Sequence, residues 1–158
     1  MEETGGGQRV RLAAEEWESW AALLLLHRMV LQDLDAELHR EHGLAVTEFD
    51  VLSTLSDAPR KQLGMSVLAH RAMLSPAGTT HLVTRLERDG LVKRSLDQAD
   101  RRKWFTVLTE QGDQALQAAR HTYNRVLRRS FLAATSPADR RTLQQLWQRL
   151  SKASPNPS

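Results

Sequence analysis

The chain has 158 residues, 41% of them hydrophobic and 26% charged, which suits one domain with a core and is too short for two ordinary domains. It contains no cysteine, so disulfides and thiolate metal sites are excluded. The apolar run at residues 21–26 falls far short of the about 20 residues that span a membrane, and the first residues lack the pattern of a secretory signal. We therefore expect a cytoplasmic protein without a membrane partner.

The net charge of +3 is distributed unevenly along the chain. Residues 1–58 hold 4 basic and 12 acidic side chains, whereas residues 59–103 hold 10 basic and 4 acidic ones. Residues 120–152 are also basic, with 8 cations and 1 anion. A polyanionic partner is therefore expected to meet the middle or the last third of the chain. The acidic first third and the basic last third could also pair across a dimer.

The first expected helix spans about residues 12–41. Gly43 ends it, because glycine adopts the left-handed cap conformation most easily. A domain of this size has little surface to cover the apolar seam of so long a helix, so we expect the seam to contribute to a dimer. With His27 counted, its positions recur at steps of three and four: Trp17, Trp20, Leu24, Leu31, Leu34 and Leu38.

Three shorter helices are expected in the middle of the chain. Thr47 is interpreted as the cap of the first of them, with Asp50 as the acid at its third helical position. A second helix fits residues 65–73. Ser75, followed by proline, caps the third, which stops at Gly90. The outer face of this last helix is expected to carry polar and basic side chains: Thr79, Thr80, Thr84, Arg85 and Arg88.

Two β-prone runs follow, residues 91–96 and 104–108, and the charged loop between them predicts a hairpin. Thr109 caps a fifth helix to about residue 134, and Ser136 caps a sixth to about residue 152. Three short helices and a hairpin between long helices indicate a mainly α fold with a small β-hairpin wing. This is the order of a winged helix-turn-helix with an N- and C-terminal helical dimerisation platform.

We therefore expect a single domain over residues 1–158. Its dimerisation helices are expected at residues 12–43 and 110–152, and its DNA-binding lobe at residues 47–109. The helix that begins after Ser75 offers free backbone N–H groups and hydroxyls, which suit contacts with phosphates and base edges.

The hairpin tip carries three consecutive cations, which repel one another unless an anion is near, and Asp100 could orient one guanidinium group. The simpler interpretations are a solvated amphipathic helix and a solvated run of charge. The candidate DNA-binding residues are Ser75, Thr79, Thr80, His81, Thr84, Arg85, Arg101, Arg102 and Lys103, with Asp100 as the buttress of the wing.

Residues 97–109, DQADRRKWFTVLT, resemble the wing signature of the MarR family of transcriptional regulators, and residues 85–94, RLERDGLVKR, resemble the segment that precedes it. The resemblance implies that the helix from Ser75 reads the major groove and that Arg102, buttressed by Asp100, enters the minor groove. It also implies a homodimeric regulator of double-stranded palindromic DNA, expected to be a repressor that a small aromatic or anionic ligand releases.

Within that family the chain looks closest to the branch that senses urate and phenolic compounds. Asp50 matches a functional acid of the branch and Arg94 a functional arginine, whereas Leu82 stands in place of a second arginine. Trp20 and His27 on the first helix complete the candidate ligand-binding residues. Each of them has a structural alternative: Asp50 as a helix cap, Arg94 as a phosphate contact, and Trp20 and His27 as core or interface residues.

Two other functions are consistent with the sequence. A metal-responsive regulator could use His39, Glu41, His42 and His121, because histidine and carboxylate suit zinc. A winged-helix protein-interaction module would not touch DNA at all, and salt-dependent binding to DNA would distinguish it. An enzyme is not expected, since there is no phosphate-cradling glycine loop, thiol or serine–histidine–acid pattern, and no cofactor is expected either.

Overall fold

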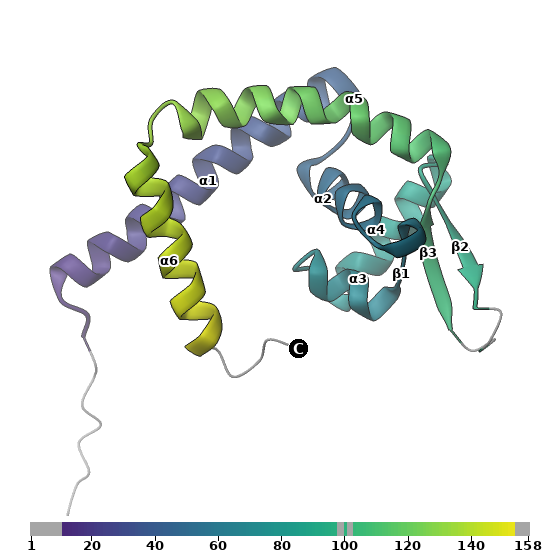
Figure 1. The fold of residues 1–158 in the computed structure, drawn as a ribbon, viewed down its shortest axis with the longest axis horizontal. Helices are drawn as coiled ribbons and strands as arrows, with labels where there is room; N and C mark the ends of the chain where they lie inside the picture. The colour runs from purple at the N-terminus through teal and green to yellow at the C-terminus, as the bar shows by residue number, and fades with distance from the viewer. Residues whose placement is uncertain (1–10, 98–99, 101–102, 154–158) are drawn as a thin grey trace, which may run out of the picture.

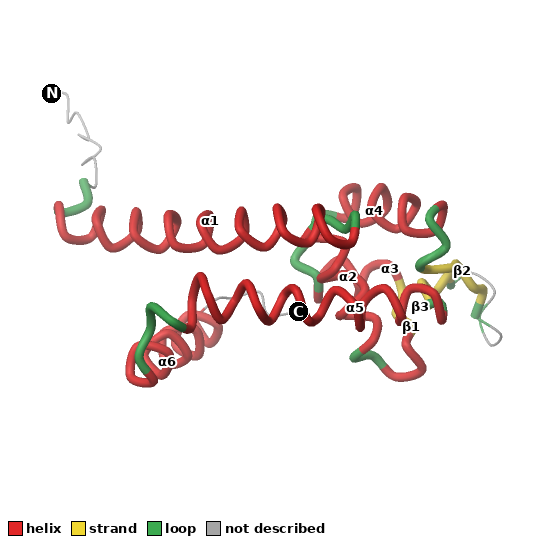
Figure 2. The backbone as a smooth tube through the Cα atoms, turned by 90° about the horizontal axis from the view of Figure 1, so that it is seen from above, coloured by secondary structure: helices red, strands yellow, loops and turns green. Residues whose placement is uncertain are grey.

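The computed structural model describes residues 11–97, 100 and 103–153, which form a mainly helical fold with one small sheet. Two long helices, α1 (Ala14–His42) and α5 (Glu110–Leu127), run side by side (Figure 1). The lobe comprises the sheet and the helices α2 (Val46–Ser56), α3 (Met65–Arg71) and α4 (Pro76–Arg88). It adjoins one end of the long pair, while α6 (Pro137–Ala153) lies at the other end (Figure 2). Helices α1, α5 and α6 are called the platform below.

The sheet has three antiparallel strands in the order β1–β3–β2. Strands β2 (Val92–Leu96) and β3 (Trp104–Leu108) form the expected hairpin. Strand β1 (Gln62–Gly64) was not expected, and it pairs with β3 so that Leu63 lies opposite Thr106. Three residues are too few for an alternating pattern to be visible in the sequence.

The core of the lobe consists of aliphatic side chains from α2, α3, α4 and the sheet, together with side chains from α1 and α5. Leu52 of α2 and Leu86 of α4 are completely buried, and Leu38 of α1 and Leu116 of α5 reach into the same cluster. Each such side chain contributes about 1.5–3 kcal/mol through its removal from water. The second half of the α1 seam is therefore covered within the chain itself.

The start of α2 differs from the expectation. Its N-cap is Ala45 rather than Thr47, and the acid at its third helical position is Glu48, whose Oε2 accepts a hydrogen bond from the backbone N of Ala45 at 2.8 Å. Leu44 and Val46 are buried, so core packing draws the start of the helix ahead of Thr47. The interpretation of Asp50 as a helix cap is therefore wrong.

The other helix ends follow the local sequence. Gly43 has a φ of 65° and ends α1 in the left-handed conformation. The Oγ of Thr109 accepts a hydrogen bond from Gly112 N at 3.0 Å at the start of α5, and Ser136 N donates to Asp139 at 2.8 Å at the start of α6. After α5 the helix widens into a π-turn at Arg128–Leu132. Within the described ranges, no helix is both long and apolar enough to cross a bilayer.

Candidate nucleic-acid interface

Helix α4 presents a polar outer face on a firmly capped start. The Oγ of Ser75 accepts a hydrogen bond from Gly78 N at 3.1 Å, and Pro76 occupies the first helical position, as expected. Val83 and Leu86 anchor the inner face and are completely buried. The exposed side chains on the opposite side are small, polar or basic, and they are Thr80, His81, Thr84, Arg85 and Arg88.

Thr79 does not lie on this outer face, contrary to the expectation. It is completely buried, and its hydroxyl donates to the carbonyl of Ser75 at 2.9 Å. Thr79, Val83 and Leu86 are spaced by four and three residues, so they share one face of the helix. That spacing was visible in the sequence, but the polar hydroxyl suggested exposure. A hydroxyl that bonds to its own helix can be buried at little cost.

Arg85 is held by an acid of another helix. Its Nε lies 2.8 Å from Oε1 of Glu48 and its Nη2 donates to Oε2 at 3.1 Å. The side chain of Glu48 is 2% exposed, whereas that of Arg85 is 47% exposed. The two residues are 37 positions apart, and no local motif of the sequence links them. Sequence reasoning selected Arg85 but missed Glu48.

Arg94 of β2 joins the base of the wing to α4. Its Nη2 donates to the hydroxyl of Thr84 at 2.9 Å, and its Nη1 lies 3.6 Å from Oε2 of Glu87. Its backbone N also donates to Glu87 at 3.2 Å. All of these contacts are with the outer part of α4. The structure thus brings Arg94 to the candidate DNA-binding surface.

The tip of the wing is only partly described. Lys103 is exposed, and its Nζ lies 3.7 Å from Oδ2 of Asp100. Arg101 and Arg102 lie outside the described residues. The insertion of Arg102 into the minor groove and its buttress by Asp100 therefore stay predictions.

The four candidate ligand-binding residues are not brought together at one site. An open hollow of about 520 Å³ beside α1 contains only His27 of the four. Trp20 is 48% exposed, and Arg94 contacts α4 as described above. The residues that line the hollow are Leu24, His27, Arg28, Leu31, Gln32, Asp35, Ala36 and Val46.

Asp50 lies half-buried in α2, and burial raises the pKa of its carboxyl group. No hydrogen bond or ion pair to this carboxylate occurs among the described residues. The adjacent residue Phe49 stacks on Tyr123 of α5, with ring centroids 4.4 Å apart. Burial, and next the charge of Asp50, raise the pKa of Tyr123. The role of Asp50 in ligand binding therefore stays a prediction.

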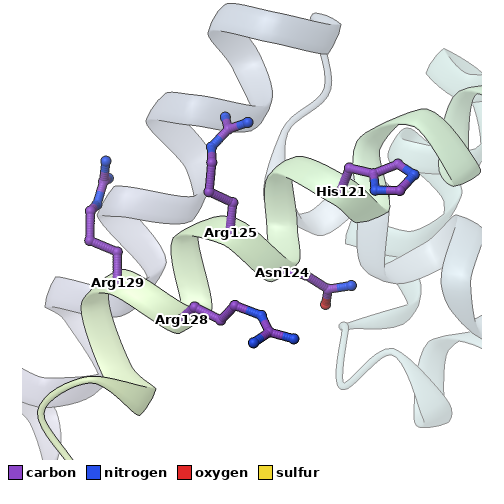
Figure 3. Close-up of a pocket in the computed structure, with 5 residues that line it drawn as sticks. All are labelled: His121, Asn124, Arg125, Arg128 and Arg129. Carbon is purple, nitrogen blue, oxygen red and sulfur yellow. The ribbon is translucent and has the colours of Figure 1, made fainter.

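A second open hollow, of about 570 Å³, lies along a basic face of α5 and the turn after it. Figure 3 shows its lining residues His121, Asn124, Arg125, Arg128 and Arg129. Arg125 binds Glu41 of α1 at 2.7 Å, and Arg129 lies 3.9 Å from Glu37, whereas Arg128 points away from α1 (Figure 3). The opposite charges of the first and last thirds of the chain are thus paired in part within the chain.

The metal-responsive alternative finds no support in the part of the chain that the structure describes. Among those residues, no group of three or more histidine or acidic side chains is placed to hold a metal ion. His42 contacts the hydroxyl of Thr122 at 2.9 Å, and Glu41 is occupied by Thr122 and Arg125.

Comparison with known proteins gives a consistent result. Residues 44–104 match the MarR family. The chain is 32% identical over 95 residues, or 60% of its length, to the homoprotocatechuate degradative operon repressor of Escherichia coli, of which the match covers 63%. It spans less than two thirds of the length of the curated relatives it matches first. The names of the first curated relatives describe regulators of transcription.

Two solved structures share the fold over nearly the whole chain. The crystal structure of Sco3205, a MarR family transcriptional regulator from Streptomyces coelicolor in complex with DNA, is similar with a TM-score of 0.88 and 24% identity, covering 96% of this chain and 95% of that one. The structure of CouR from Rhodococcus jostii RHA1 bound to p-coumaroyl-CoA has a TM-score of 0.76 and 25% identity, covering 92% of this chain and 98% of that one.

Proposed function

We propose that this chain, in which residues 44–104 carry a winged helix-turn-helix of the MarR family, is a sequence-specific DNA-binding transcriptional regulator. The observation that carries the proposal is the outer face of α4. Thr80, His81, Thr84 and Arg85 lie exposed on one capped helix beside a basic hairpin. A helix with such a face fits the major groove, where small polar and basic side chains reach base edges, while the hairpin reaches the adjacent backbone and minor groove.

The regulator is proposed to act as a homodimer through its platform. Large apolar side chains on α1 and α6 are exposed in the single chain: Trp17 and Trp20 on α1, and Trp147 and Leu150 on α6. Such a surface is the mark of an interface in a water-soluble protein. A two-fold dimer would direct both copies of α4 into successive major grooves, with half-sites about one helical turn apart on palindromic DNA.

Selection from random DNA, followed by binding measurements at several salt concentrations, tests the proposal. We expect a palindromic site and an affinity that falls steeply as salt rises. Thr80→Ala should relax discrimination at one symmetric pair of positions, by about 1–3 kcal/mol per mismatched base pair. Thr142→Ala is the matched control, because this exposed threonine of α6 bonds to its own helix in the same way as Thr80. Failure to select any site and to retain DNA at low salt would favour the protein-interaction alternative.

The wing is proposed to act through charge and groove shape rather than base edges. Arg102→Ala should weaken binding to all sequences and flatten the salt dependence by about one unit of slope for each phosphate that the variant no longer neutralises. The ratio of specific to non-specific affinity should change less. A change confined to one base pair would instead indicate direct readout by Arg102.

A small aromatic acid is proposed as the effector that releases the repressor from DNA. The hollow beside α1 combines the apolar side chains of Leu24 and Leu31 with the imidazole of His27 and the guanidinium group of Arg28. The acid that also lines it, Asp35, accepts a hydrogen bond from Val46 N at 2.9 Å. The volume of the hollow, about 520 Å³, lies in the range of small-molecule sites. One relative is named for the aromatic acid homoprotocatechuate, and CouR is bound to p-coumaroyl-CoA, the coenzyme A thioester of an aromatic acid.

Melting temperature and operator affinity, measured with homoprotocatechuate and p-coumarate, test this part of the proposal. A bound compound should raise the melting temperature and loosen binding to DNA. Arg28→Gln should abolish both responses and leave DNA affinity intact, whereas Arg141→Gln on α6 should retain them. An unchanged response in Arg28→Gln would exclude the hollow as the site. No response to either compound in the unmodified protein would count against an aromatic acid.

A further inference from the structure

We propose that Glu48 of α2 is a positioning residue for DNA readout, because it fixes the guanidinium group of Arg85 on α4 in the orientation that reads a base. The inference rests on the proposed DNA-binding function and adds to it a buried residue that does not itself touch DNA.

The geometry of the pair leaves one edge of the guanidinium free. Glu48 engages Arg85 from the side, through Nε at 2.8 Å and Nη2 at 3.1 Å. Arginine has five N–H donors in a rigid plane, so this arrangement leaves the two N–H groups of Nη1 and one of Nη2. One N–H of Nη1 and the remaining N–H of Nη2 form the end-on fork that matches the O6 and N7 acceptors of guanine. Arg85 lies on the exposed face of α4, so we infer that the fork is directed toward bound DNA.

The burial of the acid is what makes the arrangement rigid. The side chain of Glu48 is 2% exposed and sits at the first turn of α2, where it also accepts a hydrogen bond from Ala45 N at 2.8 Å. The helix start is itself held from α1, because Oδ1 of Asp35 accepts a hydrogen bond from Val46 N at 2.9 Å. A long arginine side chain on a surface is otherwise free to rotate. Fixing it before binding reduces the entropy lost when it meets a base.

A capping role alone does not account for Glu48. Helix α1 begins with the same local pattern, in which Glu16 accepts a hydrogen bond from Ala13 N at 2.7 Å. Glu16 is exposed and has no ion pair among the described residues, whereas Glu48 is buried and paired with Arg85. A carboxylate is costly to bury unless it is paired. Glu16 and Glu48 therefore both cap the start of their helix, and only Glu48 also holds an arginine.

The experiment compares Glu48→Gln, Arg85→Lys and the double variant, with Glu16→Gln as the matched control. Glutamine keeps an oxygen that can cap Ala45 N but loses the two-oxygen clamp on the guanidinium. Lysine keeps the ion pair with Glu48 and therefore the fold, but it loses the planar fork. Affinities are measured for the operator selected with the unmodified protein, for symmetric single-base variants of it, and for unrelated DNA. Melting temperatures are measured in parallel.

Glu48→Gln is expected to lower discrimination at one symmetric pair of positions by about tenfold, with affinity for unrelated DNA almost unchanged. Arg85→Lys should lower discrimination at the same positions, and the double variant should lose little more than either single variant. Glu16→Gln should leave discrimination unchanged.

The inference is wrong if Glu48→Gln weakens binding to all sequences in proportion to a fall in melting temperature, because that is a purely structural effect. It is also wrong if Glu48→Gln lowers base discrimination by the same factor in the Arg85→Lys variant as in the unmodified protein. If the protein selects an operator and Glu48→Gln does not change its base discrimination, the inference is overturned and the proposed function stands. If the unmodified protein selects no operator, the proposed function fails and the inference fails with it.

Discussion

The lobe and helix α6 of the platform differ in how far their apolar side chains are buried within the chain. In the lobe, Leu52, Val83 and Leu86 are completely buried within one chain. In the platform, Trp147 and Leu150 of α6 are 62% and 64% exposed, and no residue of α6 is buried. The core of the lobe is thus complete within one chain, whereas α6 leaves large apolar side chains exposed, as the proposed dimer requires.

The largest effect is expected from a core deletion in the lobe. Leu52→Ala removes a completely buried side chain, and it should lower the free energy of unfolding by about 2–5 kcal/mol. Urea unfolding measures the loss, which should not change with protein concentration because the cavity lies inside one chain. A loss below about 1 kcal/mol would mean that the lobe does not pack as described.

The same chemical change in the platform should act on association instead. Leu150→Ala, and more strongly Trp147→Ala, should raise the dissociation constant of the dimer, the tryptophan by about 30-fold if it is a central interface residue. Sedimentation at several concentrations measures the change, and the melting temperature of these variants should depend on protein concentration. A stable folded monomer of the unmodified protein at micromolar concentration would contradict the proposal that the exposed side chains of α6 form a dimer interface.

A smaller effect is expected at the contact between α1 and α5. Hydrogen bonds from Arg125 and Thr122 lower the pKa of Glu41 from 4.5 to about 2. Because this pKa is lower in the folded chain, the stabilisation is complete above about pH 5 and is lost as the pH falls toward 2.

Urea midpoints between pH 6 and pH 3 test the prediction for Glu41. The stability difference between the unmodified protein and Glu41→Gln should shrink on acidification. Glu18→Gln is the control, since Glu18 has no ion pair among the described residues. A difference for Glu41→Gln that stays constant over this range would show that its charge does not hold α1 to α5.

The smallest effect is expected from Asp50→Asn, which removes a half-buried charge from the lobe. Burial raises the pKa of Asp50, so its ionised form destabilises the fold, and the penalty is present above its folded pKa and absent below its unfolded one. Asp50→Asn should therefore slightly raise the melting temperature at pH 7, and the gain should disappear at acidic pH. A lower melting temperature at pH 7 would reveal a stabilising contact of the carboxylate.

Much of the architecture was predictable because it is encoded locally. Ser75, Thr109 and Ser136 begin helices through hydrogen bonds to residues three positions away, so their role is visible in a short window of sequence. Gly43 and Gly90 have positive φ, which is the conformation that glycine permits at helix ends. The hairpin followed from its β-prone residues and the polar loop between them.

Contacts between distant segments decided the rest. Strand β1 exists only because β3 pairs with it, and three residues carry no pattern of their own. Gly112 is required by packing rather than by its own conformation, since a Cβ there would lie 2.0 Å from the carbonyl oxygen of Leu91. Helix α2 begins earlier than the expected cap Thr47, because Leu44 and Val46 are buried in the core.

The candidate site divides in the same way. The positions of helix α4 and of the hairpin were predictable from the sequence, because caps, periodicity and clustered charge are properties of neighbouring residues. Three features arise from contacts between distant segments: Thr79 faces inward, Arg94 binds α4, and Glu48 holds Arg85. These outcomes depend on which surfaces meet, and a burial pattern or an ion pair across 37 residues has no local signature in the chain.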